Sequence, residues 1–212
     1  MPEFSIKEPA MPVRIVEISP GELREYSRIP SKYEVKTILQ VELIDRGLGG
    51  LLLQQAAVDK PYWKDYDAFG DTPVDWPVSF DVSRWGFFLA KDHATPVGGA
   101  VVAFASPGVD MLDGRKDLSV LWDLRVRPDY RGVGIALFRH AVKWSRERGC
   151  LQMKVETQNT NLPACRFYQR MGCELGDIRR YGYAAEPKMK HETMLCWYLD
   201  LARQEPPDGM VA

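Results

Sequence analysis

Alternation of apolar and polar residues along the N-terminal part of the chain predicts β-strands with one short helix between them. A strand is expected over Val13–Ile18, and residues 33–42 and 51–58 are apolar enough for two more. Ser19–Glu22 combines a serine cap, a proline at the first helical position and a glutamate three residues after the cap. These are helix-start residues, and the helix is expected to run to about Arg28.

The middle of the chain predicts three consecutive antiparallel strands. Gly86–Lys91 and Val97–Ala105 are apolar runs that bracket the polar turn Asp92–Pro96, which indicates a hairpin. A polar loop then leads into a further strand at Asp117–Val126. Before the hairpin, Lys60–Phe69 is rich in aromatic and acidic residues, and such a stretch either caps the core or walls a substrate pocket.

A glycine turn at Arg131–Ala136 connects the strand that ends at Val126 to the longest helix expected, Arg131–Arg148. The helix has an apolar stripe made of Leu137, Phe138, Ala141, Val142 and Ser145, and Gly149 ends it. Glycine lets the backbone approach a ligand, and the free N–H groups and dipole of a helix start favour an anion. We therefore predict a pyrophosphate site formed by Arg131, Gly132, Val133, Gly134, Ile135 and Ala136.

The C-terminal part completes a mixed fold. Leu151–Thr157 alternates as a strand with one polar side, so strand, helix and strand imply a right-handed crossover and a parallel pair. Asn159–Asn161 starts a second helix that Gly172 ends, and strands are expected around 173–183 and 191–201. The prediction is an α+β fold with a central, mixed, mostly antiparallel twisted sheet flanked by helices.

Composition narrows the class of protein. The chain has 212 residues with 45% hydrophobic and 27% charged residues, which suits one domain, expected at 13–202 between flexible ends at 1–12 and 203–212. A net charge of −1 gives no general attraction to nucleic acid or an anionic membrane, and no apolar run is long enough to span one. The cysteines are spaced without a C-x-x-C motif, so we expect reduced thiols in a cytoplasmic protein and no metal site. The sequence leaves open whether the protein forms a homodimer.

The chemistry of the glycine turn favours coenzyme A over a nucleotide. The turn lacks the G-K-[ST] of a triphosphate-binding loop, and no acidic residue stands where a dinucleotide's ribose is bound. Coenzyme A has a pyrophosphate and an amide-containing arm that can add to a strand edge by main-chain hydrogen bonds. Leu124 and Val126 are the residues expected to supply those bonds.

The same segment resembles the GNAT family of N-acetyltransferases. Arg131–Ala136, RGVGIA, is similar to the family's R/Q-x-x-G-x-G/A signature, and Val155–Gln158, Asn161, Ala164, Phe167, Tyr168 and Gly172 resemble the second half of its acetyl-CoA site. The resemblance implies acetyl-CoA as co-substrate, no metal, and the GNAT fold. It also implies a split in the sheet between the strand at 119–126 and the strand at 151–157.

Within the family, the chain most resembles the streptothricin acetyltransferases. The likeness rests on Pro61–Tyr66, on Glu156–Gln158 through Cys165, on Leu175-Gly176 and on Glu192–Met194. It implies transfer to a primary amine of a small molecule, such as a streptothricin-like antibiotic, and a role in antibiotic resistance. The likeness departs at Arg179, which stands where those enzymes have an acid.

A second likeness keeps a peptide acceptor open. Ile178–Arg180 together with Tyr183 resembles the ribosomal-protein N-terminal acetyltransferases. A third alternative is a non-catalytic acyl-CoA sensor, in which Glu156 and Tyr168 point away from the thiol.

An attacking amine with a pKa of about 10.4 needs a base, and a departing thiolate needs an acid. Glu156, on the polar side of its strand, is the first candidate base and Asp123 is the second; each has the alternative of a surface or ion-paired acid. Tyr168 is the candidate acid, with a core tyrosine as its alternative.

The remaining candidates contact the two substrates. Asn161 either binds the pantetheine arm or caps its helix, and Ala164 is placed beside it on the acetyl-CoA side by the resemblance. The acceptor pocket is expected to be lined by Asp65, Tyr66, Trp85 and Tyr183.

Overall fold

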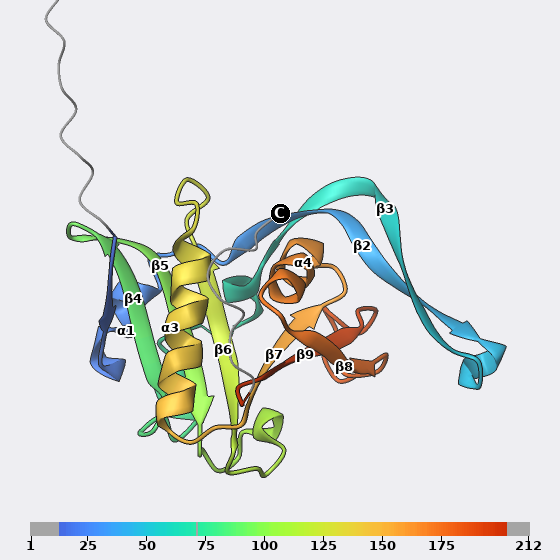
Figure 1. Ribbon diagram of the computed structural model, residues 1–212. Coiled ribbons are helices and arrows are strands. Elements are labelled where there is room, and N and C mark those ends of the chain that lie inside the picture. Colours follow the sequence, from blue (N-terminus) through green and yellow to red (C-terminus); the bar gives the residue numbers. More distant parts are fainter. Residues whose placement is uncertain (1–12, 71, 203–212) are drawn as a thin grey trace, which may run out of the picture.

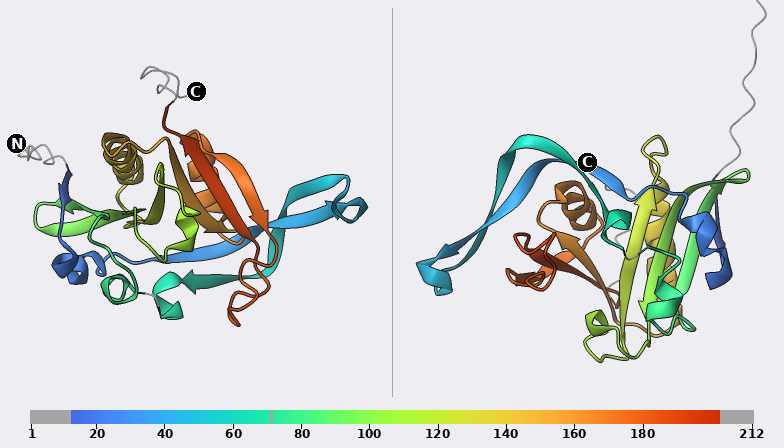
Figure 2. Two further views of the ribbon diagram at one scale, coloured as in Figure 1. Left: turned by 90° about the horizontal axis from the view of Figure 1, so that it is seen from below. Right: turned by 180° about the vertical axis from the view of Figure 1, so that it is seen from behind.

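The computed structural model describes residues 13–70 and 72–202, which form one mixed sheet with helices on both faces and a separate two-stranded arm (Figures 1 and 2). The strands are β1 Arg14–Glu17, β2 Lys32–Ile44, β3 Gly50–Asp65, β4 Gly86–Asp92, β5 Thr95–Phe104, β6 Leu118–Val126, β7 Gln152–Gln158, β8 Glu174–Arg179 and β9 Met194–Asp200. The α-helices are α1 Leu23–Tyr26, α2 Trp76–Ser79, α3 Val133–Glu147 and α4 Leu162–Arg170. Short 3-10 turns are η1 Pro20–Glu22, η2 Asp45–Gly47, η3 Tyr66–Phe69 and η4 Asp110–Leu112.

The seven-stranded sheet has the order β1-β4-β5-β6-β7-β9-β8, and its only parallel neighbours are β6 and β7. Alternate residues of the central strands pack on opposite faces. Phe88 and Val102 lie in the core beneath α3 and α4, whereas Phe87 and Val101 lie in the core beneath α1 and α2. This confirms the α+β class, the hairpin and the parallel crossover expected from the sequence.

The sheet splits where β6 and β7 part (Figure 1). They pair over only four registers, Leu118–Leu121 with Gln152–Val155. At this point the register of β6 against β5 slips, because Val101 pairs with Asp123 and Val102 with Leu121. Trp122 is therefore the extra residue of a β-bulge, and bulges bend and twist the strand that carries them. Beyond Trp122, β6 follows β5 and turns away from β7, which confirms the predicted split.

The β2–β3 arm is longer than the sequence pattern suggested. It includes the expected strands at 33–42 and 51–58, but β3 continues to Asp65, so much of the aromatic stretch 60–69 is strand. The pairing skips from Val35–Tyr62 to Thr37–Ala57, which places Pro61 in an irregularity where the missing N–H of proline is tolerated. Figure 1 shows the arm arching over α4 and away from the sheet.

Other helix and strand boundaries also differ from those expected from the sequence. The helix expected up to about Arg28 consists of η1 followed by the four-residue α1, although Ser19 and Glu22 do form the predicted cap, with the Ser19 N–H donating to Glu22 Oε2 at 2.8 Å. The strand expected around 173–183 ends at Arg179, and the loop 180–193 follows it. The proposed flexible ends, 1–12 and 203–212, lie outside the described residues. No helix among the described residues is both long and apolar enough to span a membrane.

Candidate active site

A cavity of about 340 Å³ opens where β6 and β7 separate. Its walls come from both sides of the split, with Asp123 and Leu124 on β6, Glu156 on β7, and Ala164 and Tyr168 on α4. Tyr66 of η3 and Tyr183 of the 180–193 loop close it from the far side. The fold thus brings the three catalytic candidates to one cavity, together with five other predicted site residues: Tyr66, Leu124, Asn161, Ala164 and Tyr183.

The N-terminus of α3 has the features of an anion cradle. Ala136 donates the first backbone hydrogen bond of the helix, to the Gly132 carbonyl at 3.1 Å, so the N–H groups of residues 132–135 precede the helical ladder. Gly132 caps the helix with a φ of 81°, a conformation that favours glycine. Arg131, Ile135 and Ala136 are exposed beside it, whereas Val133 is buried beneath.

The rest of the split fits the arm of coenzyme A. A Cβ added at Gly134 would meet Val126 and Phe167 at 3.7–3.8 Å, an ordinary contact, so the protein's own packing does not require glycine there. Past the bulge at Trp122, β6 is paired only with β5, which leaves its other edge for main-chain hydrogen bonds at Leu124 and Val126.

Glu156 has the environment expected of a general base. The Tyr183 hydroxyl donates to its Oε1 at 2.5 Å. Burial raises the pKa of Glu156 above its ordinary value, opposed by the Tyr183 hydrogen bond and by the charges of Lys154 and Arg179. A carboxyl group with a raised pKa binds a proton more readily, which is the task of a base near neutral pH.

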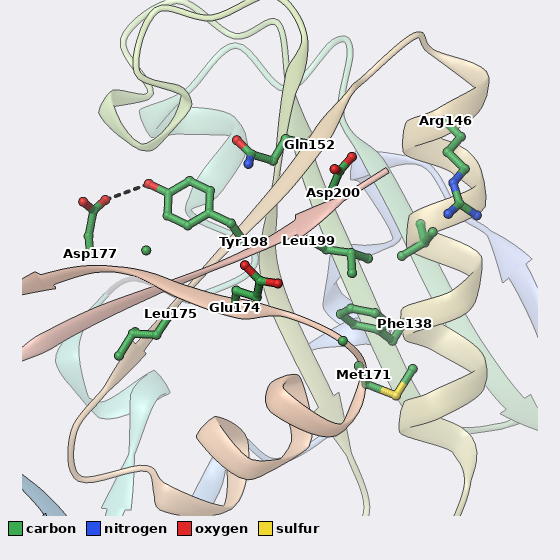
Figure 3. A pocket seen from close by; sticks show the side chains of 13 residues that line it. Phe138, Arg146, Gln152, Met171, Glu174, Leu175, Asp177, Tyr198, Leu199 and Asp200 are labelled. Atoms are coloured by element: carbon green, nitrogen blue, oxygen red, sulfur yellow. Dashed lines mark hydrogen bonds between the residues drawn. The ribbon is translucent and has the colours of Figure 1, made fainter. Parts of the chain in front are cut away.

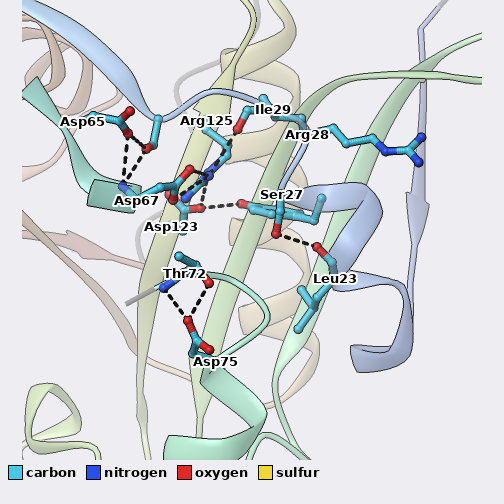
Figure 4. Close-up of polar contacts among 12 residues, drawn as sticks. Leu23, Ser27, Arg28, Ile29, Asp65, Asp67, Thr72, Asp75, Asp123 and Arg125 are labelled. Atoms are coloured by element: carbon cyan, nitrogen blue, oxygen red, sulfur yellow. Dashed lines mark hydrogen bonds and ion pairs between the residues drawn. The ribbon is translucent and has the colours of Figure 1, made fainter. Parts of the chain in front are cut away.

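Asp123 is held in an ion-paired network (Figure 4). Its Oδ2 accepts from Arg125 Nε at 2.6 Å and from the Tyr26 hydroxyl at 2.9 Å. Arg125, only 6% exposed, also donates to Asp67 at 3.0 Å and to the Ile29 carbonyl at 3.2 Å. This is the ion-paired alternative considered for Asp123, and it leaves Glu156 as the carboxylate better placed to accept a proton.

The Tyr168 side chain lines the cavity from α4 and packs against Phe138 and Phe167. Among the described residues its hydroxyl has no hydrogen-bond partner, and burial raises its pKa well above the ordinary value. The hydroxyl therefore stays protonated and is available to a group inside the cavity.

Comparison with known proteins identifies the family. The model of the Acetyltransferase (GNAT) family matches residues 53–173, more than half of the chain. The protein belongs to the GNAT family. It is an acetyl-CoA-dependent N-acetyltransferase.

The sequence of this acetyltransferase is similar to those of named relatives over most of its length. It is 26% identical over 185 residues to the streptothricin acetyltransferase of Escherichia coli, covering 86% of this chain and 94% of that protein. It is 28% identical over 173 residues to the streptothricin acetyltransferase of Streptomyces lavendulae, covering 79% and 86%. The crystal structure of a nourseothricin acetyltransferase superposes with a TM-score of 0.70 at 23% identity, covering 89% of this chain and 98% of that one. A Bacillus anthracis structure in complex with acetyl coenzyme A has a TM-score of 0.66 at 22% identity, covering 91% and 99%.

Three predicted residues have structural roles in this acetyltransferase. Trp85 lies in the core, stacked on Phe80 and tilted against Trp122, and does not line the cavity. The Asp65 side chain caps η3 by accepting from the Asp67 N–H at 3.2 Å. Asn161 caps α4 through its Oδ1, which accepts from the Ala164 N–H at 3.2 Å, while its side chain also lines the cavity.

A larger hollow of about 630 Å³ lies between α3 and the β8–β9 edge (Figure 3). Phe138, Met171 and Leu199 line it, and the Tyr198 hydroxyl donates to Asp177 at 2.7 Å beside it. It shares no lining residue with the cavity at the split and contains none of the predicted site residues. Asp177 therefore accepts a hydrogen bond from Tyr198 and does not line the cavity at the split.

Sequence reasoning missed Arg125 and included Gln158 only within the resemblance of Val155–Gln158 to an acetyl-CoA site, yet both residues line the cavity. Each had a usable signal, because Arg125 is two residues from Asp123 and Gln158 is two residues from Glu156, and residues two apart on a strand share a face. The partner of Arg125 at Asp67 had no such signal, since the two are separated by 58 residues. Among residues 13–70 and 72–202, no group of three or more histidine, cysteine, aspartate or glutamate side chains is placed to hold a metal.

Proposed function

We propose that this acetyltransferase transfers an acetyl group to a primary amine of a small cationic molecule, such as a streptothricin-like antibiotic, by direct attack. The observation that carries the proposal is the cavity at the split, which presents Glu156 on one wall and Tyr168 on the other next to the α3 cradle. The relatives named as streptothricin acetyltransferases support the choice of acceptor.

The charge of the cavity suits an ammonium acceptor. Glu156 and Asp123 line it, and Asp67 stands behind them. Arg125 is the cation on the same wall, and it is shared between Asp123 and Asp67. The acidic groups therefore outnumber the basic one, and a negative cavity concentrates cations. Aromatic walls from Tyr66, Trp76 and Trp122 supply faces for such a cation.

The residues divide the proton transfers between them. Glu156 takes the ammonium proton and passes it to solvent, so that the nitrogen can bond to the thioester carbonyl carbon. It then takes the second proton that the nitrogen loses as the amide forms. The carbon–sulfur bond then breaks, and Tyr168 donates its proton to the departing thiolate. The acetylated amine and the free thiol leave, and the proton held by Glu156 restores the tyrosine through solvent. No covalent bond to the protein is needed, which agrees with Cys165 being buried.

The size of the cavity favours a small acceptor over a protein N-terminus. Lys188 donates to the Ala68 carbonyl at 3.2 Å, and the buried Lys64 is ion-paired to Glu192. These contacts join the 180–193 loop to β3 and to η3, which borders the cavity. A volume of about 340 Å³ suits a small molecule.

An acceptor screen tests the proposal. Purified protein and acetyl-CoA are mixed with streptothricin, polyamines, aminoglycosides or short peptides, and thiol release is followed. We expect streptothricin-like or polyamine acceptors to raise release above hydrolysis, and Glu156→Gln to abolish the increase. A response to peptides alone would replace the small-molecule acceptor by a peptide N-terminus. No response to any of these amines would refute the proposed acceptor class.

A further inference from the structure

A hydrogen-bonded chain runs through the wall of the cavity from the start of α4 to Glu156. The Asn161 Nδ2 group donates to the Tyr66 hydroxyl at 3.1 Å, and that hydroxyl donates to Gln158 Oε1. The Gln158 Nε2 group donates to the Tyr183 hydroxyl at 3.1 Å, and Tyr183 donates to Glu156 Oε1 at 2.5 Å. The chain joins four parts of the fold: the α4 cap, η3, the end of β7 and the 180–193 loop.

The direction of each bond follows from the orientation of the Asn161 and Gln158 amides, and the contact of the Tyr66 and Tyr33 hydroxyls, at 3.4 Å, is a longer one. Asn161 uses its Oδ1 to cap α4, so its amino group faces Tyr66. An amide oxygen only accepts, so the single hydroxyl proton of Tyr66 goes to Gln158. The Gln158 amino group only donates, so Tyr183 receives that bond and gives its own proton to Glu156. All donors therefore point toward the Glu156 carboxylate.

The chain orients its members but does not conduct protons. Passing a proton along it would require the Gln158 amide to give up an amino proton while gaining one on oxygen. Glu156 Oε1 is occupied by Tyr183, and the carboxylate's second oxygen, Oε2, remains to accept a proton from the acceptor amine.

We propose that Tyr183 is a positioning residue, held by Gln158 and Tyr66, that fixes the Glu156 carboxylate so that Oε2 is its proton-accepting atom. The inference rests on the proposed function, and it reassigns Tyr183 from contacting the acceptor to orienting the base. The burial of Gln158 and Tyr183, at 7% and 5% exposed, keeps water from substituting for either bond.

The charged and titratable groups around Glu156 come from every neighbouring element. Lys154 lies two residues before it on β7 and is ion-paired to Asp113 at 2.8 Å. Cys196 is its paired residue on β9, and Arg179 approaches from β8. Asp123 and Arg125 face it from β6 across the cavity. None of these donates a hydrogen bond to the carboxylate in the described structure, so Tyr183 is the group whose removal changes its direct contacts.

Two measurements on Tyr183→Phe test the proposal, with Tyr181→Phe as the matched control because Tyr181 is 75% exposed in the same loop. The first is the titration of the Glu156 carboxyl by carbon-13 NMR, with the signal assigned from its loss in Glu156→Gln. Losing a donor to the ionised form should move the midpoint up by roughly one pH unit, a tenfold change in the ionisation constant. Tyr181→Phe should leave it unchanged.

The second measurement is the pH profile of kcat/KM with the acceptor found in the screen. The acidic limb should move up with the NMR midpoint, with a loss of roughly fivefold at the pH of the wild-type midpoint and no change in KM for acetyl-CoA. Tyr66→Phe, two bonds further away, should shift the limb in the same direction by less.

The NMR titration needs no acceptor, so it separates the two hypotheses. A shifted midpoint in a protein that acetylates no amine would uphold the role of Tyr183 and refute the proposed function. An unchanged midpoint in folded Tyr183→Phe would refute the positioning role whatever the screen shows. A fall in kcat without any movement of the acidic limb would also count against it.

Discussion

Replacing Arg125 by methionine should destabilise the protein more than any exposed arginine substitution. Arg125 is buried and bonded to Asp123 Oδ2 at 2.6 Å, to both oxygens of Asp67 at 3.0–3.1 Å and to the Ile29 carbonyl (Figure 4). Methionine fills a similar volume but leaves the two carboxylates close together without their cation. Removing one partner from a buried ion pair costs about 3–5 kcal/mol, and the 28% exposure of Asp67 places the expected cost near the lower figure.

For a domain of this size, ~3 kcal/mol corresponds to a fall of roughly 6–12 °C in Tm, measured by calorimetry or circular dichroism. Arg115→Met is the control, because Arg115 makes a similar pair with Asp117 at 2.9 Å while 38% exposed, and solvent screens such pairs. Its Tm should stay close to that of the wild type.

The origin of the loss can be separated from simple truncation. In Asp67→Asn the second carboxylate is already neutral, so adding Arg125→Met should cost less than it does in the wild type. Equal costs in the two backgrounds, or a Tm for Arg125→Met within a degree of the Arg115→Met control, would refute the idea that these ion pairs stabilise the wall of the cavity.

Three further substitutions address the site. Glu156→Gln should lower kcat/KM by about 10²–10⁴-fold. Burial raises the pKa of Glu156 in the folded protein, so the ionised carboxylate destabilises the fold at pH values above that pKa. The Tm of Glu156→Gln should therefore exceed that of the wild type at pH 8 but not at pH 4. A lower Tm at pH 8 would contradict this. Tyr168→Phe should reduce kcat with little change in KM for acetyl-CoA. Because the raised pKa of Tyr168 keeps its hydroxyl protonated, the wild-type rate should show no alkaline limb from this residue. A Tyr168→Phe rate equal to that of the wild type from pH 6 to 10 would rule out Tyr168 as the acid. Gly132→Ala should lower the free energy of unfolding by about 1 kcal/mol because residue 132 has a positive φ. Gly134→Ala should leave Tm nearly unchanged and raise only KM for acetyl-CoA. If neither variant changes KM for acetyl-CoA, the start of α3 does not bind the pyrophosphate.

The donor side of the candidate site could be predicted from the sequence because that side is built from local pattern. A strand, a glycine turn and a helix are contiguous at Leu118–Glu147, and Glu156 and Tyr168 follow within a single further strand and helix. Their proximity depends only on the parallel crossover, whose handedness is nearly invariant.

The acceptor side depends on contacts between distant segments. Alternate residues of β4 face opposite sides of the sheet, and Phe87, with Trp85 stacked on it, faces the core beneath α1 and α2. A cluster of aromatic residues in the sequence does not reveal which of them face that side. The length of β3 is decided by its pairing with β2, since Lys60 and Pro61 interrupt any apolar pattern there. The link between Asp67 and Arg125 is likewise set by tertiary folding, and so is that between Tyr66 and Gln158.

The β2–β3 arm has a consequence for handling the protein. A two-stranded ribbon exposes hydrogen-bonding groups along both outer edges, which is the arrangement from which strands of different molecules add to one another. At the far end of the arm, Leu43, Ile44, Leu51 and Leu52 are 39–49% exposed and Leu48 is 91% exposed. The part of the arm near α4 is anchored, because the Leu39 N–H donates to the Asn159 carbonyl at 2.8 Å and the Leu39 carbonyl accepts from the Asn159 side chain. Aggregation during expression or storage is therefore expected to begin at the tip of the arm. Replacing these exposed apolar residues by lysine should improve solubility without changing the lining of the cavity.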